Sequence, residues 1–425
     1  MPAMPVTAQI PATGWREQAP VFLAGSAAAT AMVSIAASQL LLGLAILSLI
    51  VTGTRLRWPP ITAPLAVFAL WTVLSLAASG HVREGFPQIK KFYVFLTLFV
   101  VYSAVTNLRQ IRWIMLASIA GATLSALWSL EQFARKYAAA QAAHQDFYAY
   151  YIPSRITGFM GHWMTFSGEM MIALLLALAL ILFAPAFAPG QPRPLLAALL
   201  VALAITGTGL LAAETRSMWG GAVAGGLYLL WRRNRWLVAI LPLLAAGLYL
   251  TNLFEIRERI GSMLTPHGEL DSNGHRALLR RVGWAMIQAH PLLGLGPEQV
   301  GKQFDAYLPA DVPRPIPVSY YTGHLHNIYF HYAAERGLPA LAALLWMLGR
   351  ALFDLLRGLR GLGAGSPAWV LHAAVATLIA TMVGGFYELN LGDSEVLATF
   401  LSVVACGYAA LDQSVLEQAK ARESV

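Results

Sequence analysis

The chain has 425 residues, of which 57% are hydrophobic and 12% are charged, and its mean hydropathy is +0.59. This composition excludes an ordinary soluble domain, in which about a quarter of the residues are charged. The formal net charge is +8. Among the partners we expect membrane lipids and no nucleic acid. The single cysteine, Cys406, falls in the last apolar segment, so disulfides are not expected to stabilise the protein.

Apolar segments run almost without a break from Val21 to Leu411. A bilayer core requires about 20 apolar residues per helix, so the pattern predicts an all-α polytopic membrane protein with about twelve transmembrane helices. They are expected at residues 20–35, 37–53, 62–79, 89–106, 113–133, 163–187, 195–213, 217–231, 236–253, 328–352, 368–386 and 396–411. The first twenty residues are polar and rich in proline, so no cleavable signal peptide is predicted.

The short loops predict the orientation. Loops on one side of the expected bundle carry eleven arginines against one acid, Asp354, a strong positive-inside bias. The expected parts are a cytoplasmic N-terminal segment (1–19), nine transmembrane helices (20–253), a largely helical periplasmic loop with the catalytic residues (254–327), three transmembrane helices (328–411) and a cytoplasmic tail (412–425).

The long polar loop is expected to fold. Residues 254–323 contain seven basic and seven acidic side chains, with apolar residues at helical spacing near 253–263 and 275–289. Pro291 and the glycines that follow are expected to end the second helix in a tight turn. The segment Asp271-Ser-Asn-Gly274 is a candidate N-cap, which would place Arg276 in the first helical turn. There, backbone amides and a guanidinium group could hold an anion.

Several basic residues fall on the outer side, against the insertion preference. They are Arg83, Lys90, Lys91, Arg135, Lys136, Arg155 and Arg216. In one interpretation their side chains extend from helix ends to lipid phosphates. In the other, some bind an anionic ligand. Arg216 favours the second interpretation, because it lies in a very short outer turn and is expected to point into a cavity.

Three motifs stand out in residues 155–385. They are Thr215-Arg216-Ser217, Arg276 followed by Ala285-Met-Ile-Gln-Ala-His-Pro291-Leu-Leu-Gly294-Leu-Gly296, and His326-Asn327 with nine residues before Gly337. As a set they resemble the O-antigen ligases and, more broadly, the O-antigen ligase and polymerase superfamily. The family pattern usually has a second glycine three residues after the last, where this chain has Ala340, a small residue that we interpret as a packing variant.

The resemblance implies an activity and a location. It implies transfer of a finished polysaccharide from undecaprenyl diphosphate to lipid A–core, on the periplasmic face of the bacterial inner membrane. It implies neither a nucleotide nor a metal cofactor. The expected partners are therefore the lipid-linked donor, the lipid A–core acceptor and membrane lipids.

Such a transfer requires basic residues. A sugar joined through C1 to a diphosphate has a good leaving group, so the protein must stabilise negative charge as the C1–O bond breaks. Guanidinium groups suit this role because they stay charged and bind phosphate oxygens in pairs. Arg216 and Arg276 are the predicted diphosphate ligands, with Arg280, Arg155 and Lys90 as further substrate-binding candidates.

The acceptor hydroxyl must also lose its proton. His326 is the predicted general base, because it matches the family motif and histidine titrates near working pH. His324 and Asn327 are candidates for binding or orienting the substrate, although the two histidines are expected to face different directions at a helix start. Glu335 lies about 14 Å farther along the helix, so we expect it to be an internal partner for Arg336 or for another helix and not a catalytic acid.

Other interpretations stay open. Asp393-Ser-Glu395 could bind a divalent cation beside a diphosphate, although acidic outer loops are ordinary and no metal is expected. A polymerase would use the same donor with a second lipid-linked repeat as acceptor, and only the His-Asn motif favours the ligase. A lipid-linked oligosaccharide transporter should show an internal repeat, which we do not find. A protein-acceptor transferase should carry an extra C-terminal region.

Overall fold

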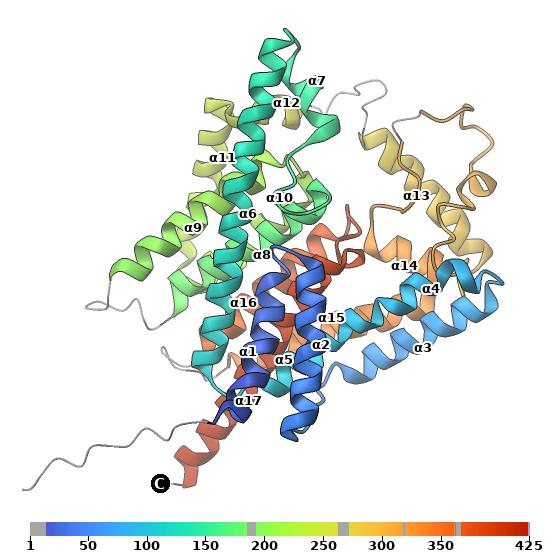
Figure 1. The fold of residues 1–425 in the computed structure, drawn as a ribbon. Coiled ribbons are helices and arrows are strands. Elements are labelled where there is room, and N and C mark those ends of the chain that lie inside the picture. Colours follow the sequence, from blue (N-terminus) through green and yellow to red (C-terminus); the bar gives the residue numbers. More distant parts are fainter. Residues whose placement is uncertain are drawn as a thin grey trace, which may run out of the picture.

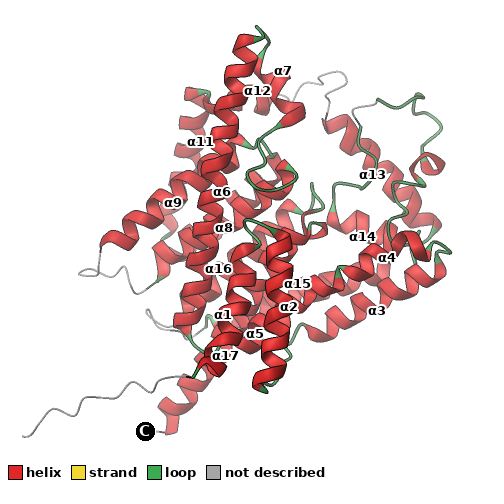
Figure 2. Ribbon diagram, in the orientation of Figure 1, coloured by secondary structure: helices red, strands yellow, loops and turns green. Residues whose placement is uncertain are grey.

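The computed structural model describes residues 14–184, 193–261, 272–317, 320–360, 362 and 367–423. These residues form helices and connecting loops without strands, which confirms the predicted all-α polytopic fold (Figure 2). Six helices in the described segments are long and apolar enough to cross a membrane. They are α2 (Ile35–Thr52), α6 (Leu108–Ala142), α8 (Trp163–Phe183), α9 (Arg193–Ala212), α15 (Leu338–Gly358) and α17 (Ser394–Glu423).

Shorter helices complete the bundle and its outer end. They are α1 (Trp15–Thr30), α3 (Thr62–Ala78), α4 (Val82–Lys90), α5 (Phe92–Ala104), α7 (Phe147–Tyr151), α10 (Arg216–Arg233), α11 (Ile240–Thr251), α12 (Ile256–Gly261), α13 (Ser272–Ala289), α14 (Ile328–Arg336) and α16 (Ala368–Gly384). Short 3-10 turns lie between them: η1 (Ile152–Ser154), η3 (Arg235–Ala239), η4 (Leu253–Glu255), η6 (Phe304–Tyr307) and η7 (Asn390–Gly392).

The expected count of twelve spans is not confirmed. By length and composition the described residues contain six candidate spans, or seven if one bent pair is counted. That pair, Arg235–Thr251 and Leu253–Gly261, turns by 113°. The expected single span at 328–352 is wrong, because Gly337 separates α14 from α15 with a φ of +86°.

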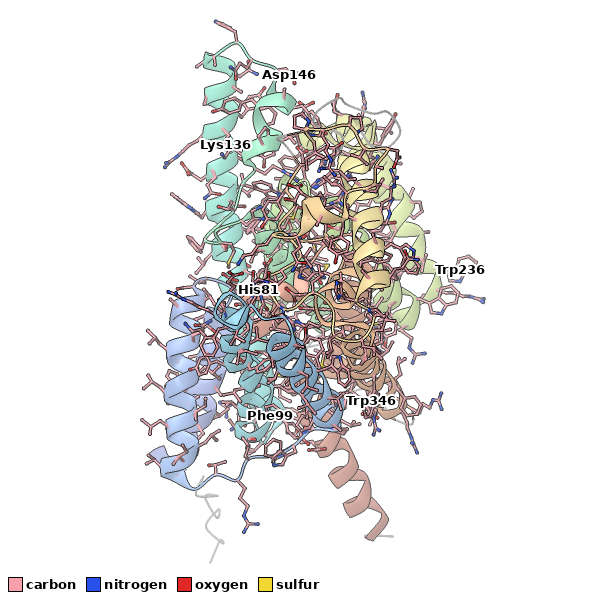
Figure 3. All side chains as sticks on the ribbon, turned by 90° about the vertical axis from the view of Figure 1, so that its right-hand side faces the viewer. His81, Phe99, Lys136, Asp146, Trp236 and Trp346 are labelled. Carbon is pink, nitrogen blue, oxygen red and sulfur yellow. The ribbon has the colours of Figure 1, made fainter. Side chains whose placement is uncertain are left out.

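One end of the bundle extends well beyond the rest. Helix α6 has 35 residues, a length of about 52 Å at 1.5 Å per residue, whereas a bilayer core is about 30 Å thick. Its far end carries Lys136 and lies beside α7 and α12, away from Phe99 and Trp346 (Figures 1 and 3). Helix α13 and the start of α14 lie on the same half of the molecule (Figure 1).

The polar loop folds around an apolar cluster of its own, as its helical spacing predicts. Leu279, Val282 and Met286 on α13 pack with Phe304 and with Leu325 in a cluster separate from that of the main bundle. Helix α13 begins at Ser272, so the expected position of Arg276 in the first turn is wrong. The candidate N-cap Asp271 lies outside the described residues.

The turn after α13 crosses the break between α14 and α15. The amides of Leu295 and Gly296 donate to the carbonyls of Ala334 and Glu335 at 2.9 and 2.8 Å. Gly294 has a φ of +66°, and a Cβ there would lie 2.4 Å from the backbone carbon of Glu335. This close backbone crossing requires a residue without a side chain, which gives the glycine of the His-Pro-Leu-Leu-Gly motif a physical reason.

Candidate functional site

Two adjoining cavities occupy the outer half of the protein. The first, about 620 Å³, is lined by polar groups from α4, α10, α12, α13, α14 and the loop before α17. The second, about 700 Å³, is more apolar and lies against α10, α13, α14 and the end of α16. Both include Arg216 and Arg276 in their lining, so these two residues stand at the border between the cavities.

Four arginines converge on the first cavity. Arg216 is the first residue of α10, Arg276 comes from α13, Arg259 from α12 and Arg155 from the loop after η1. The backbone carbonyl of Glu214, in the short turn before α10, accepts from Arg155 Nη1 at 3.0 Å and from Arg259 Nε at 3.1 Å. This turn therefore gathers the guanidinium groups, although they come from segments far apart in the sequence.

The arginine cluster has an excess of positive charge. Burial raises the pKa of Glu214 to about 8, against the opposing effect of Arg259 and Arg155, so its carboxyl is largely neutral at pH 7. Burial, followed by the charge of Arg259, lowers the pKa of Arg155 to about 9. Burial also lowers the pKa of Arg276. Arg276 Nε is buried without a hydrogen-bond partner among the described residues. An anion in this cavity would offset the burial of the Arg155 and Arg276 charges and could accept a hydrogen bond from Arg276 Nε.

His326 lies at the base of the same cavity. Its Nδ1 is 3.1 Å from both carboxylate oxygens of Glu388. A carboxylate accepts hydrogen bonds, so Nδ1–H donates to Glu388, and Nε2 is the nitrogen that can gain or lose a proton. Burial works to raise the pKa of Glu388, but the charge and hydrogen bond of His326 outweigh it and hold that pKa at about 2. The carboxylate therefore stays ionised beside the ring.

The start of α14 holds His326 in place. Asn327 Oδ1 caps α14 by accepting from the amides of Tyr329 and Phe330, both at 2.9 Å, and its Nδ2 donates to the carbonyl of Phe386 at 2.8 Å. His326 precedes this cap with a φ of +46°. The cap thus ties the histidine to the end of α16, which leads directly into Glu388.

Comparison with known families identifies this arrangement. Residues 199–345 match the family model described as O-antigen ligase. This match supports the O-antigen ligase and polymerase superfamily. No curated protein matches the chain. The matched range contains Arg216, Arg276 and His326, whereas Arg155 and Glu388 lie outside it. Residues outside the matched range therefore line part of the cavity.

The two neighbouring histidines lie together in the O-antigen ligase-type domain, and the expectation that they face different directions is wrong. The rings of His324 and His326 are 4.2 Å apart, because both residues lie in the loop before α14 and not on the helix. The amide of His326 donates to His324 Nδ1 at 3.3 Å. Burial, with the charge of His326, lowers the pKa of His324 to about 3. His324 is therefore neutral, with its proton on Nε2.

The other predicted site residues divide between the two cavities. Arg280 and Asn327 line the second cavity, and Arg155 lines the first. Lys90 lines neither, and its ammonium lies 5.7 Å from the ring of Phe86. Lys91 takes its place in the first cavity and donates to the carbonyl of Gly392 at 2.9 Å. Of the two adjacent lysines, Lys91 and not the predicted Lys90 therefore lines the cavity.

Several lining residues were missed by sequence reasoning. Glu388 stood in the sequence only as one of three acids in an outer loop, and Arg259 as a charged residue on a loop helix. His331 and His275 carried no motif at all. One signal in the sequence could have found Glu388 and Arg259, because ionisable groups beside apolar segments are often functional. That signal does not predict which residues they contact.

One group of side chains has the composition of a metal site. Single ligand atoms of His324, His326 and Glu388 all lie within 4.8 Å of one another, and imidazole with carboxylate suits a divalent transition ion. Among the described residues, the Asp393–Glu395 pair does not form such a cluster. Asp393 instead accepts from the hydroxyl of Thr165 at 2.8 Å.

Glu335 pairs with Arg336, as predicted, but it also reaches the cavity. Arg336 Nε donates to one carboxylate oxygen at 3.0 Å, and the amide of Glu298 donates to the other at 2.8 Å. Glu335 lines the same cavity as His326. The sequence argument treated both residues as points on one helix, whereas α14 begins only at Ile328.

Proposed function

We propose that this protein is an O-antigen ligase that moves a polysaccharide from undecaprenyl diphosphate to lipid A–core. One observation carries the proposal. A histidine held by a carboxylate, His326 with Glu388, lines the same cavity as four arginines. Arginines suit the diphosphate of the donor, and a carboxylate-oriented imidazole suits the acceptor hydroxyl.

The proposed step is one displacement at the anomeric carbon. The acceptor oxygen attacks C1 of the donor sugar and forms the new glycosidic bond, while the C1–O bond to the diphosphate breaks. The acceptor proton passes to His326 Nε2, and Glu388 stabilises the charge that the ring gains. The leaving undecaprenyl diphosphate keeps the bonding electrons, and Arg216 and Arg276 balance its charge.

The arginine positions suit a ligand that reaches both cavities. Arg216 and Arg276 border both cavities, and Arg280 lines the more apolar one. A lipid-linked diphosphate has a charged group joined to an apolar chain, so it suits a boundary between a polar and an apolar cavity. We propose Arg155 and Arg259 as further groups that hold the charged part.

We propose that the site faces the periplasm of a bacterial inner membrane. The arginine-rich short loops then face the cytoplasm, and the far end of α6 with α7, α12 and α13 projects outward (Figure 1). In this orientation residues 254–327 form the periplasmic segment that supplies catalytic residues. The flanking segments complete the site.

A reconstituted reaction tests the proposal. Purified protein is mixed with undecaprenyl-diphosphate-linked polysaccharide and lipid A–core in the presence of a chelator. We expect lipid A–core to gain the polysaccharide. Transfer onto a second lipid-linked repeat would instead identify a polymerase, and movement of the donor across vesicles without a new glycosidic bond would identify a transporter. Activity lost only with the chelator would move catalysis to a metal at His324, His326 and Glu388.

A further inference from the structure

We propose that His331, held by Glu335, forms a separate subsite in the first cavity that binds the acceptor sugar through its hydroxyl groups. This inference rests on the proposed function and deepens it, because the proposed function assigns His326 to the acceptor proton but no residue to the binding of the acceptor sugar. His331 is the fourth residue of α14, one turn after the Asn327 cap, and lines the cavity with its side chain only 7% exposed.

His331 has an unused polar atom. Its Nδ1 is buried and has no hydrogen-bond partner among the described residues, whereas its Nε2 is 3.6 Å from a carboxylate oxygen of Glu335. A buried polar atom without a partner costs about 1–3 kcal/mol. A hydroxyl group in the cavity would remove that cost, since it can donate to a ring nitrogen or accept from one.

The support behind His331 is rigid and does not need the histidine. Glu335 accepts from the Glu298 amide at 2.8 Å and from Arg336 Nε at 3.0 Å. Arg336 also donates to Gln88 Oε1 at 2.9 Å and to the hydroxyl of Thr72 at 3.3 Å. The carboxylate therefore keeps two partners if His331 is replaced, so a variant at His331 tests binding and not folding.

The charge of the cavity separates this subsite from the diphosphate. Arg216 and Arg276 line both cavities, whereas His331 lines only the first. The first cavity is also lined by carboxyl side chains, among them Glu298, Asp393 and Glu335, of which Glu335 lies 3.6 Å from His331 Nε2. Carboxylates repel a diphosphate but accept hydrogen bonds from sugar hydroxyls. The lining thus favours the phosphate at the arginines and an uncharged, hydroxyl-rich ring beside His331.

A row of rings connects the subsite to the proposed base. The ring of His331 lies 6.4 Å from that of His324, which lies 4.2 Å from that of His326. A sugar bound at one end of this row can present a second hydroxyl toward the other end. His331 is therefore a binding residue for the acceptor, and His326 remains the residue that takes the proton.

The test compares two substitutions at His331. His331→Phe keeps a ring of similar size and removes both polar atoms, whereas His331→Gln keeps a donor and an acceptor. With saturating donor and varied lipid A–core, we expect KM for the acceptor to rise about tenfold in His331→Phe, the value of one lost hydrogen bond. His331→Gln should stay within about threefold of the unmodified protein. The matched control is His144→Asn, at an exposed position after α6 that lines neither cavity.

The readouts separate failure of this inference from failure of the proposed function. Binding of undecaprenyl diphosphate should be unchanged in every variant, because the arginines hold it. An unchanged acceptor KM in His331→Phe, with active transfer, would overturn the acceptor subsite alone. A fall in kcat or in diphosphate binding with the acceptor KM unchanged would also overturn it. No transfer by the unmodified protein would overturn the proposed function, and lipid A–core binding by His331→Phe and the unmodified protein would then still be compared directly.

Discussion

The cavity contains two histidine–glutamate pairs, and they differ in what else holds the carboxylate. Glu388 comes from the loop after α16 and contacts His326 Nδ1 with both oxygens at 3.1 Å. Its other hydrogen bond within the described part of the chain comes from the neighbouring amide of Leu389. Glu335 lies on the same helix as His331, at a longer 3.6 Å, and its oxygens are taken by Arg336 and the amide of Glu298.

The difference indicates two roles for the same residue types. In the proposed function, Glu388 orients the His326 ring and stabilises the charge that the ring gains as a base. Glu335 accepts hydrogen bonds from Arg336 and from the amide of Glu298, so it supports the fold. His331 Nδ1 has no hydrogen-bond partner among the described residues and can bind a ligand in the proposed subsite. Residue identity alone does not separate the pairs, whereas the remaining partners of each carboxylate do.

The largest effect is expected from a substitution at the proposed base. His326→Ala should lose transfer by about 10²–10⁴, the range for removal of general-base help. Binding of undecaprenyl diphosphate should persist, because the arginines provide it. Single-turnover transfer and donor binding, measured on the purified variant, check both expectations. A wild-type rate, or a variant that no longer binds donor, would exclude the role of His326 as base.

The crossing that supports the second pair is also open to test. Gly294→Ala should destabilise the protein by roughly 3 kcal/mol or more, because it adds left-handed strain and a Cβ 2.4 Å from the backbone of Glu335. Gly349→Ala, on the exposed face of α15 with nothing within 4 Å of its added Cβ, is the control and should be neutral or stabilising. Thermal unfolding in detergent measures the difference. Equal stability of the two variants would contradict the packing argument.

Arg216 and Arg276 line the same cavity as both histidine–glutamate pairs. Arg216→Lys and Arg276→Lys should each weaken donor turnover by roughly 10², because an ammonium cannot reproduce two parallel hydrogen bonds to phosphate. Donor KM and undecaprenyl diphosphate affinity are the measurements. Arg83→Lys, at an exposed position outside both cavities, is the control. Full activity in both site variants would leave only bulk charge as their contribution.

Glu388→Gln sharpens the comparison within the first pair. Glu388 acts only through His326, so its loss should lower kcat by roughly 10², the lower end of the general-base range, and should add little to His326→Ala. The lowered pKa of about 2 keeps Glu388 ionised above pH 4.5. Its stabilising contribution is present above that pH and is lost as the pH falls toward 2. Additive losses in the double variant would show that Glu388 acts independently of His326.

Asp393 gives the smallest effect and the clearest pH dependence. Burial raises its pKa to about 6 from 3.8, despite the hydrogen bond from Thr165. The folded protein thus favours the neutral carboxyl, and the associated stability is complete below pH 3.8 and is lost as the pH rises through about 6. Asp393→Asn stays neutral, so its melting temperature should exceed that of the unmodified protein at pH 8 and match it at pH 4. Asp305→Asn, at an exposed loop position, is the control. A gain that does not depend on pH would contradict the titration.

Local sequence predicted the elements but not all of their ends. Apolar spacing indicated the helix at 275–289, and Pro291 ended it as expected, because both effects act within a few residues. The expected span at 328–352 failed at Gly337. The sequence there reads Glu335-Arg336-Gly337-Leu-Pro339, so charged residues, a glycine and a proline interrupt the apolar pattern. The turn at Leu292 crosses the backbone at the same point.

The candidate site was predictable where a motif or a short turn constrained the side chain. Arg216 follows a turn too short to let it turn away, and it lines both cavities. Lys90 and Lys91 could not be distinguished, because α4 and α5 meet at an angle that their own residues do not specify. The paired rings of His324 and His326 depend on a φ of +46° at His326, which no local preference of histidine predicts.

The sequence by itself determined the class of the protein, its apolar segments, the folding of its polar loop and three motifs of the O-antigen ligase superfamily. These properties depend on composition and on spacing along one helix or turn. Only the tertiary structure decided that Glu388 meets His326 across 62 residues and that His331 faces the same cavity as four arginines. Such contacts follow from how α10, α13, α14 and α16 pack together, and packing is decided by the whole set of facing side chains and not by any one segment.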